Sequence, residues 1–295
     1  MLPATKAQPK ELLTVVDKPV IQYNVEEAAA SGLRQIILVT AAGKSALEDH
    51  FDVSVELERR LEQKGDTRAL EAVRALAGLV QISSIRQKQP FGLGHAVLAA
   101  KSLVGDEPFA VFLPDDIMHS PGDPVMAQLL RVFRQRPGAV LATGRAPRED
   151  AGKYGMLAVK PLGPRLYQVT DLVEKPTPGQ APSDLAIMGR YVLIPEVFAA
   201  LERTAPGVGG EVQLTDGIKL LMEHHPVYAY EYEGRRYDCG SKLGYLRATV
   251  ELALAHPDLG RTFRQYLEEL LAEGGAMQAP HSPGGAVMAV AANAS

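Results

Sequence analysis

Short apolar runs alternate with segments of helical periodicity through the first 150 residues, and this alternation restricts the fold more than any other feature of the sequence. The predicted strands are residues 35–40, 80–86, 109–113 and 139–143, and the predicted helices are residues 21–31, 94–101 and 125–134. Such alternation is typical of an α/β protein, in which helices cover both faces of a mixed, mostly parallel sheet. The run at 35–40, QIILVT, is apolar almost throughout, which predicts a strand buried on both faces.

After residue 150 the pattern changes. Strand-like segments separated by turn residues predict a small β-rich insertion, antiparallel or mixed, beside the main sheet. These segments are residues 156–159, 166–174 and 186–193; after them we predict helices at 196–203 and 213–223, a strand at 227–232, and helices at 242–255 and 259–273. Residues 274–295 contain no Asp, Glu, Lys or Arg and have no periodicity, so we expect a disordered tail there.

The composition excludes several classes of protein. With 31 basic and 35 acidic residues the net charge is −4, so the chain lacks the overall positive field of a nucleic-acid-binding protein. No apolar run approaches the roughly 18 residues of a membrane span, and the N-terminus lacks a signal-peptide core. The single cysteine, Cys239, can form neither an internal disulfide nor a cysteine-based zinc site, and we expect a packed thiol there. We therefore expect a cytoplasmic protein with no nucleic-acid or membrane partner.

Acidic residues stand where two predicted strands end, the edge at which ligands bind in open α/β sheets. Asp115 and Asp116 follow the strand at 109–113, and Asp238 follows the last strand and precedes a helix. Carboxylate oxygens suit Mg²⁺, which one or two protein carboxylates usually bind together with substrate phosphates. Either acidic site could instead be the N-cap of a following helix, and the residues alone leave both interpretations open.

Two further groups of residues could bind a phosphorylated sugar. Glu174 and Lys175 end the strand at 166–174. The glutamate could accept sugar hydroxyls and the lysine could contact a phosphate, although an edge strand with surface charges is the alternative. Lys6 and Lys10, in the polar opening segment, could clamp phosphates or simply be solvated.

The loop after the second predicted strand combines Gln87 with glycines. Gly92 and Gly94 let a ligand approach the backbone, and the Gln87 amide offers the paired donor and acceptor that an imide edge needs. An ordinary loop with two glycines is one alternative. A dinucleotide-binding fingerprint of Gly92, Gly94 and Asp115 is another, but Val97 at the third glycine position argues against it.

Eight segments stand in a distinctive order along the chain: MLPATKAQPKELLTVVDKPVIQY, FGLGHAV, LPDD, KYGML, EKP, GRYVL, GGEVQLTD and YDCGSKLGY. Their order and spacing closely resemble the bacterial UTP–glucose-1-phosphate uridylyltransferase family over residues 1–273. The resemblance implies a Rossmann-like nucleotidyltransferase fold, a requirement for Mg²⁺, and condensation of UTP with glucose 1-phosphate to give UDP-glucose and pyrophosphate. It also implies a homodimer or homotetramer. Within one nucleotidyltransferase domain, we expect residues 1–145 to bind the nucleotide and residues 146–273 to contain the sugar-binding part and the C-terminal helices.

The resemblance implies roles for individual residues. Lys10 resembles the lysine that contacts the UTP phosphates, Asp115 the metal ligand, and Asp238 a second acid near the metal. Lys175 resembles the lysine on the sugar phosphate, so the expected catalytic residues are Lys10, Asp115 and Lys175. The other implied contacts are Glu11, Gln87 and Gly92 with the uracil end, and Gly155, Glu174 and Gly189 with the glucose.

The chain departs from the family at one point. The family's first strand and its glycine-rich G-x-G-T-R loop lie upstream of the segment that matches Met1, and this sequence has neither. We therefore expect a longer natural protein, two strands with an unpaired edge, and a 295-residue chain that is poorly soluble or inactive. Two other hypotheses stay open: a protein that binds a nucleotide sugar without turnover, and a metal-dependent glycosyltransferase that uses Asp115 and Asp116.

Overall fold

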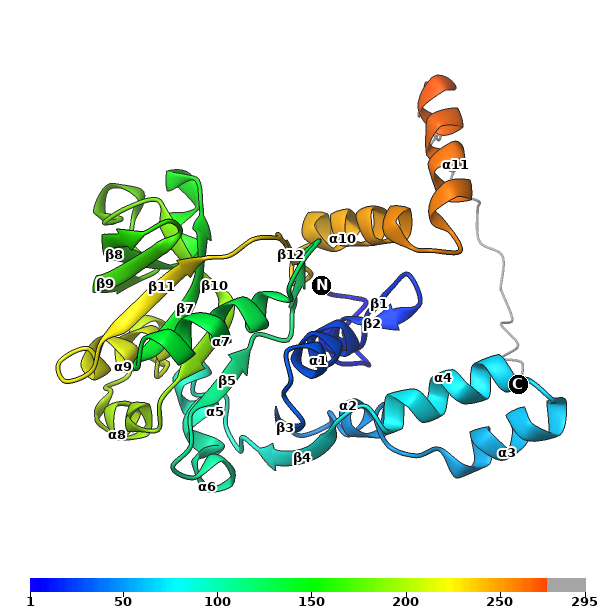
Figure 1. Ribbon diagram of the computed structural model, residues 1–295, viewed down its shortest axis with the longest axis horizontal. Helices are drawn as coiled ribbons and strands as arrows, with labels where there is room; N and C mark the ends of the chain where they lie inside the picture. The colour runs from blue at the N-terminus through cyan, green and yellow to red at the C-terminus, as the bar shows by residue number, and fades with distance from the viewer. Residues whose placement is uncertain (275–295) are drawn as a thin grey trace, which may run out of the picture. The chain divides into compact units, whose positions relative to one another are not determined.

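The computed structural model describes residues 1–274, and the chain divides into two compact units, Met1–Thr249 and Val250–Ser295. The first unit contains a six-stranded sheet (Figure 1). Its strands, in hydrogen-bonded order, are β5 (Phe109–Phe112), β10 (Leu185–Leu193), β7 (Ala139–Arg145), β11 (Val227–Glu231), β9 (Leu166–Glu174) and β8 (Gly155–Gly163). All six overlap segments that the sequence predicts as strands.

The directions of these strands correct one expectation. β10 is antiparallel to both of its neighbours, β5 and β7, and within residues 1–274 the only parallel pair of this sheet is β7–β11. The α/β class with a mixed sheet is confirmed, but the prediction of mostly parallel pairing is wrong, because β10 returns between β5 and β7. The predicted β-rich insertion, β8 and β9, is antiparallel as expected and continues the sheet through the β9–β11 pair.

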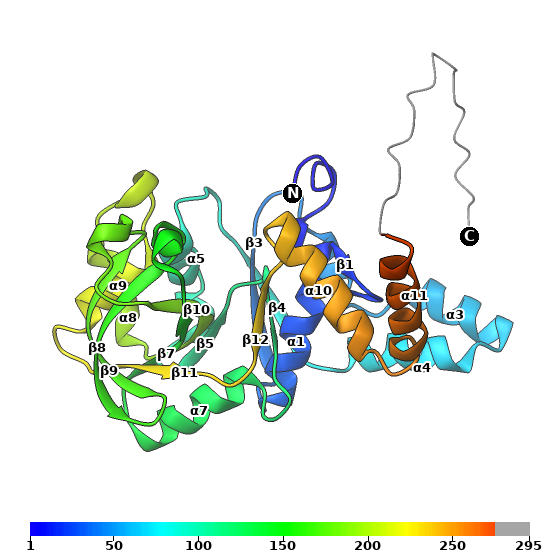
Figure 2. The same ribbon diagram turned by 90° about the horizontal axis from the view of Figure 1, so that it is seen from above.

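Helices cover both faces of this sheet, as predicted (Figure 2). α7 (Val125–Gln135) packs on one face, against β7 and β10. On the other face lie α5 (Leu93–Ala99), α8 (Glu196–Arg203) and α9 (Leu214–Leu221). Leu129 of α7 and Ile218 of α9 are fully buried on opposite sides of the strands. Because there is a hydrophobic core on each face, all nine residues of β10 are buried.

A separate two-stranded sheet pairs β3 (Gln35–Thr40) with β4 (Gln81–Arg86) in parallel. The helices that pack on it are α1 (Val20–Ala30) and α2 (Ala46–Asp49), together with Leu76 of a later helix. They form a small apolar cluster around Leu38, whereas Val39 is 36% exposed, so the prediction that this strand is buried on both faces is wrong. Within residues 1–274, β3 pairs only with β4 and β5 only with β10, so each of these two strands has one edge without a strand partner.

The sequence pattern misses two longer helices and two strands near the candidate site, besides other short elements. α3 (Val55–Lys64) has no buried residue and α4 (Thr67–Ala77) has one, although the sequences of both helices are amphipathic. β6 (Asp116–His119) and β12 (Arg235–Asp238) pair antiparallel, and their polar sequences carry no strand pattern. This last pair positions the candidate site.

The remaining elements are short or lie near the C-terminal end. The short ones are β1 (Thr14–Val15), β2 (Lys18–Pro19), α6 (Lys101–Val104) and 3-10 helices at Lys10–Leu12, Arg148–Lys153, Pro178–Gln180 and Val208–Gly210. The predicted last two helices are confirmed as α10 (Lys242–Ala255) and α11 (Gly260–Ala272). Among the described residues, no helix has both the length and the apolar character needed to cross a bilayer. Apart from Gly274, the predicted disordered tail lies outside the described residues.

Candidate active site

The β6–β12 pair brings together the two acids that the sequence places far apart. Its register sets Asp116 directly opposite Asp238, and the Cys239 N–H donates to the Asp115 carbonyl over 2.8 Å. A Cβ atom added to Gly240 would lie 3.0 Å from Asp238 Oδ1 and 3.1 Å from Asp115 Oδ2. The carboxylates of Asp115 and Asp238 therefore converge on one glycine.

The opening segment adds positive charge to these acids. Lys10 Nζ donates to Asp115 Oδ2 over 2.6 Å. Burial lowers the pKa of Lys10, but the hydrogen bond to Asp115 and the charges of Asp115, Glu11 and Asp238 outweigh it, so the pKa is raised. Glu11 is itself buried; Lys44 Nζ donates to its Oε1 over 2.8 Å, and no described residue bonds its Oε2. The structure thus groups Glu11 with Lys10 and Asp115.

The N-cap interpretation of the acids is wrong. Asp116 begins a strand, β6, and no helix follows it directly. Asp238 Oδ1 accepts a hydrogen bond from the Gly240 N–H, and the side chain at the start of α10 is Ser241, whose Oγ accepts from the Gly244 N–H over 3.1 Å.

The donor set fits a hard divalent cation that is shared with a ligand. Two carboxylates, those of Asp115 and Asp238, meet at a loop where phosphate oxygens can complete the coordination. Residues 1–274 contain no cluster of three or more His, Cys, Asp or Glu side chains, so a cage made by the protein alone is absent there. Cys239 is buried beside these acids, and burial, followed by their charges, raises its pKa to about 12, which confirms a packed thiol.

Glu174 is held at a second point of the site. It ends β9 opposite Gly155, the first residue of β8, and Thr215 Oγ1 donates to its Oε2 over 2.7 Å. β11 pairs with β9 only at residues 166–168, so the end that carries Glu174 pairs with β8 alone, but the Glu174 side chain is only 12% exposed and is not a solvated surface charge. Lys175 Nζ lies 3.6 Å from Glu174 Oε1, and its backbone φ of 45° is left-handed. Sequence reasoning missed Thr215.

Gly189 lies in the middle of β10 and packs against Asp116 of the acidic loop. It has a left-handed φ of +57°, and an added Cβ would lie 2.3 Å from Asp116 Oδ2. Glycine is therefore required here by the packing of the protein itself. Burial, then the charges of Glu174 and Asp116, raise the pKa of Tyr191, so both acids lie near that residue.

Gln87 and Gly92 form a third group. The Gln87 amide donates to the Gly92 carbonyl over 3.2 Å and lies 2.9 Å from His95 Nδ1. A Cβ added to Gly92, where φ is +97°, would lie 2.7 Å from Glu211 Cβ. The segment that packs on Gly92 leads within a few residues to Thr215, the partner of Glu174, so one segment contacts two of the three groups.

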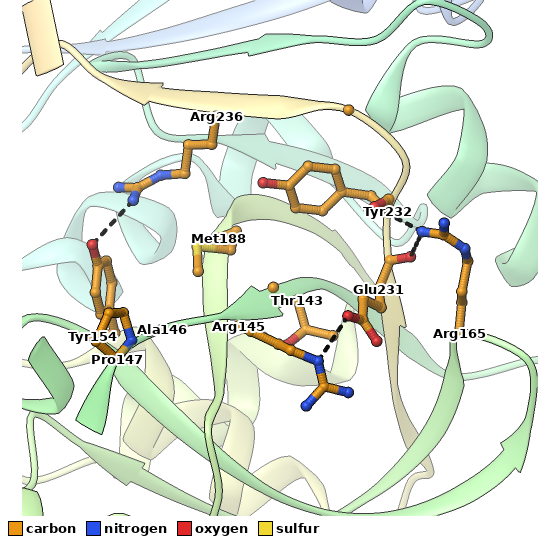
Figure 3. A pocket seen from close by; sticks show the side chains of 12 residues that line it. Thr143, Arg145, Ala146, Pro147, Tyr154, Arg165, Met188, Glu231, Tyr232 and Arg236 are labelled. Carbon is orange, nitrogen blue, oxygen red and sulfur yellow. Dashed lines mark hydrogen bonds and ion pairs between the residues drawn. The ribbon is translucent and has the colours of Figure 1, made fainter. Parts of the chain in front are cut away.

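Two arginines behind the acids, one fully buried and one partly buried, were not predicted. Arg190 is 0% exposed and forms an ion pair with Glu27 over 2.7 Å. Arg236 pairs with Asp116 over 2.8 Å and bonds the Tyr154 hydroxyl over 3.3 Å, in the wall of a cavity of about 350 Å³ (Figure 3). Burial raises the pKa of Asp116 although Arg236 opposes the shift. The sequence does contain a signal for Arg190, because it interrupts an otherwise apolar strand, LAIMGRYVL.

Comparisons with known proteins identify the family. Residues 1–254 match the nucleotidyl transferase family. The chain is 48% identical to a UTP–glucose-1-phosphate uridylyltransferase of Bacillus subtilis (strain 168), over 92% of each protein. A protein of the same name from Staphylococcus epidermidis is 46% identical, over 91% of this chain and 93% of that protein.

Solved structures give the same result. A UTP-bound enzyme from Acinetobacter baumannii is 41% identical with a TM-score of 0.85, over 91% of this chain and 94% of that one. A UDP-glucose pyrophosphorylase complexed with UDP-glucose is 38% identical with a TM-score of 0.80, over 87% and 94% of the two chains. These matches overturn the dinucleotide-fingerprint alternative, and Val97 packs in the core. The chain belongs to the nucleotidyl transferase family and, within it, to the UTP–glucose-1-phosphate uridylyltransferases.

Proposed function

We propose that this protein transfers the uridylyl group of UTP to glucose 1-phosphate, which gives UDP-glucose and releases pyrophosphate. The observation that supports this most strongly is the pairing of β6 with β12, because it brings Asp115 and Asp238 together at the point where Lys10 bonds Asp115. The names of the relatives, and the solved homologues that hold UTP or UDP-glucose, favour the same reaction.

The charges of the site suit the main difficulty of this reaction. Two phosphate esters must approach each other, and two unit charges ~4 Å apart repel by ~4 kcal/mol at an effective dielectric constant of about 20. In the proposal, Lys10 exchanges its bond with Asp115 for the phosphates of UTP, and Lys175 contacts the phosphate of the sugar. Both lysines then offset the repulsion in the ground state and in the transition state.

A divalent cation belongs to this proposal, and we propose Mg²⁺. Asp115 and Asp238 would hold it, with phosphate oxygens as further ligands. When bound, the cation supplies positive charge against the repulsion and against the charge of the transition state. A general base is not required, because the nucleophile is already an anionic phosphate oxygen that attacks the α-phosphorus in line as pyrophosphate leaves. The inert thiol of Cys239 is consistent with this.

We assign the glucose end of the product to the residues around Glu174 and its uracil end to the residues around Gln87. Glu174, fixed by the Thr215 hydroxyl, would accept glucose hydroxyls, with Gly155 and Gly189 beside the ring. Gln87 and Gly92 would contact the uracil edge, and the unbonded Oε2 of Glu11 is a further acceptor for the nucleotide.

The direct test is pyrophosphate release from UTP and glucose 1-phosphate with Mg²⁺, followed by the same assay with dTTP, CTP and ATP. From an active chain we expect pyrophosphate and UDP-glucose in equal amounts, UTP as the preferred nucleotide, and loss of activity on chelation; no release of pyrophosphate would agree with the expectation that the 295-residue chain is inactive. Binding of UDP-glucose without turnover would indicate a binding protein. Release of UDP from UDP-glucose by an acceptor sugar would indicate a glycosyltransferase.

The proposal includes two further expectations, on the oligomeric state and on the location in the cell. We propose a homodimer or homotetramer, which sedimentation of the purified protein can distinguish from a monomer. We also propose a cytoplasmic location, which suits the single free thiol of Cys239 and can be examined by fractionation of the producing cells.

A further inference from the structure

Each backbone carbonyl of the acidic loop, residues 113–116, accepts a hydrogen bond from another part of the protein. The Arg190 guanidinium donates through Nη1 to the carbonyl of Leu113 over 3.4 Å and through Nη2 to that of Asp116 over 3.0 Å. The Asn24 side-chain amide donates to the Pro114 carbonyl over 3.3 Å, and the Cys239 N–H donates to that of Asp115. All four carbonyls of the loop therefore have a donor.

The guanidinium that reaches this loop is itself fixed on every side. Its Nε and Nη2 donate to Glu27 Oε2 over 3.0 and 2.7 Å, and Nη2 also donates to Asn24 Oδ1 over 2.8 Å. The other oxygen of Glu27 accepts from the Met126 N–H at the start of α7, over 3.0 Å. The face of the guanidinium lies 4.6 Å from the centre of the Phe112 ring. One planar group thus connects α1, β5, β10 and α7.

We propose that Arg190, held by Glu27 and Asn24, is a positioning residue for Asp115. By binding the carbonyls on both sides of Asp115, it fixes the direction in which that carboxylate leaves the loop. The inference rests on the proposed function, in which Asp115 meets the cation and the phosphates. An arginine suits this role better than a lysine, because its planar fork directs several donors at fixed angles.

A purely structural role for Arg190 is the competing explanation, and the two roles predict different results. If Arg190 only stabilises the fold, then any substitution of equal thermodynamic cost affects activity equally. If it positions Asp115, its loss lowers kcat beyond what lost stability explains, because small displacements of a reacting group can cost about 100-fold in rate.

The test compares Arg190→Lys with Leu129→Ala, which empties a fully buried position of α7 away from the loop. Both variants and the wild type are assayed for kcat, for the KM values of UTP and glucose 1-phosphate, and for the Mg²⁺ concentration that gives half-maximal rate. We expect Arg190→Lys to lower kcat about 100-fold and to raise the Mg²⁺ requirement. Leu129→Ala, at a temperature where both variants are folded, should stay within about twofold of the wild type.

A second readout needs no activity. The amides of Leu113, Asp116 and Cys239 each donate to a carbonyl in or next to the loop, so their hydrogen exchange reports its order. We expect Arg190→Lys to speed exchange at these amides at least tenfold while the β7–β11 ladder is unchanged. If Arg190→Lys does not fold, Asn24→Ala, which removes the Pro114 contact, one partner of Arg190 and a bond to the Val20 carbonyl within α1, should give the same pattern with a smaller amplitude.

Unchanged exchange at the three amides, or a loss of kcat no larger than in Leu129→Ala, would overturn the positioning role. Failure of the proposed function is a separate outcome: the wild type would then release no pyrophosphate, while the exchange pattern still decides whether Arg190 orders the loop.

Discussion

Strands β10 and β3 both have mostly apolar sequences, but they are buried to different extents. All nine residues of β10 are buried, because helices cover both faces of its sheet and strands pair with both of its edges. β3 pairs only with β4 within the described residues, and Val39 stays 36% exposed above a small cluster around Leu38. The same kind of sequence thus forms a fully buried strand in one region and a half-buried strand in the other.

The candidate site spans these two regions. The acids, Glu174 and Arg190 belong to or pack against the six-stranded sheet, whereas Gln87 directly follows β4. We therefore expect substitutions near the six-stranded sheet to affect chemistry and stability strongly, and substitutions near β3 and β4 to affect nucleotide binding with smaller costs.

The largest effect is expected for Asp115→Asn. Removing this charge should lower kcat about 1,000-fold, or ~4 kcal/mol of transition-state stabilisation, with the fold unchanged. Its counterpart in the other region, Gln87→Ala, should raise the KM for UTP about tenfold and leave kcat nearly unchanged. Steady-state pyrophosphate release measures both, with the exposed Asp106→Asn as the control carboxylate. Full activity of Asp115→Asn at saturating Mg²⁺ would remove Asp115 from the proposed mechanism.

Gly189→Ala should be strongly destabilising. Its Cβ would meet Asp116 Oδ2 at 2.3 Å in a left-handed backbone, so we expect a loss of about 4 kcal/mol in the free energy of unfolding, or no folded protein. Gly105 has a similar φ of +68° with open space around it, and Gly105→Ala should cost only about 1 kcal/mol. Chemical denaturation compares them, and equal costs would show that Asp116 moves aside freely.

The two hydrophobic regions can be compared by matched cavities. Leu129→Ala, in the fully buried core, should lower the free energy of unfolding by about 4 kcal/mol. Leu38→Ala, in the small cluster beside β3, should cost about 2 kcal/mol, because the site is less enclosed and can relax. Thermal or urea unfolding gives both values; a larger cost at Leu38 would reverse the comparison of the two regions.

The smallest effect is expected for Thr215→Val. It removes the hydroxyl that fixes Glu174 at nearly constant volume, a bond that we expect to contribute about 1 kcal/mol. The KM for glucose 1-phosphate should rise about fivefold, while that for UTP stays the same. Thr204→Val is the matched control, because its hydroxyl bonds only the Ala200 carbonyl within α8 and the turn that follows it. Equal changes in both KM values would argue against a sugar-specific role.

The sequence predicts the apolar part of this molecule well. β3, β9, α8 and α10 have the predicted boundaries, because each carries a clear period of two or 3.6 residues or an unbroken apolar run. The mostly parallel pairing was wrong, because the return of β10 between β5 and β7 depends on tertiary packing that no local pattern encodes. The helices α3 and α4 bury almost nothing, but their apolar residues recur at helical spacing, so they could have been predicted.

Site residues were predictable only where a residue type that suits the chemistry stands at a telling place in the sequence, such as the end of a predicted strand. Asp115, Asp238 and Glu174 stand at strand ends, and motif order points to them. Thr215 and Arg236 depend on contacts between distant segments, and neither has a local signal. Arg190 could have been found, since a charged residue in a buried strand needs a partner, but the partner itself, Glu27, lies on a helix 163 residues away.

The central claim is that the acids at the ends of β5 and β12 bind UTP through a divalent cation. Calorimetric titration of the protein with UTP, with and without Mg²⁺, tests it most directly when the wild type is compared with the Asp115→Asn/Asp238→Asn double variant. We predict that Mg²⁺ tightens UTP binding at least tenfold, or ~1.4 kcal/mol, in the wild type and has no effect in the double variant. Equal affinity in all four titrations would contradict the account.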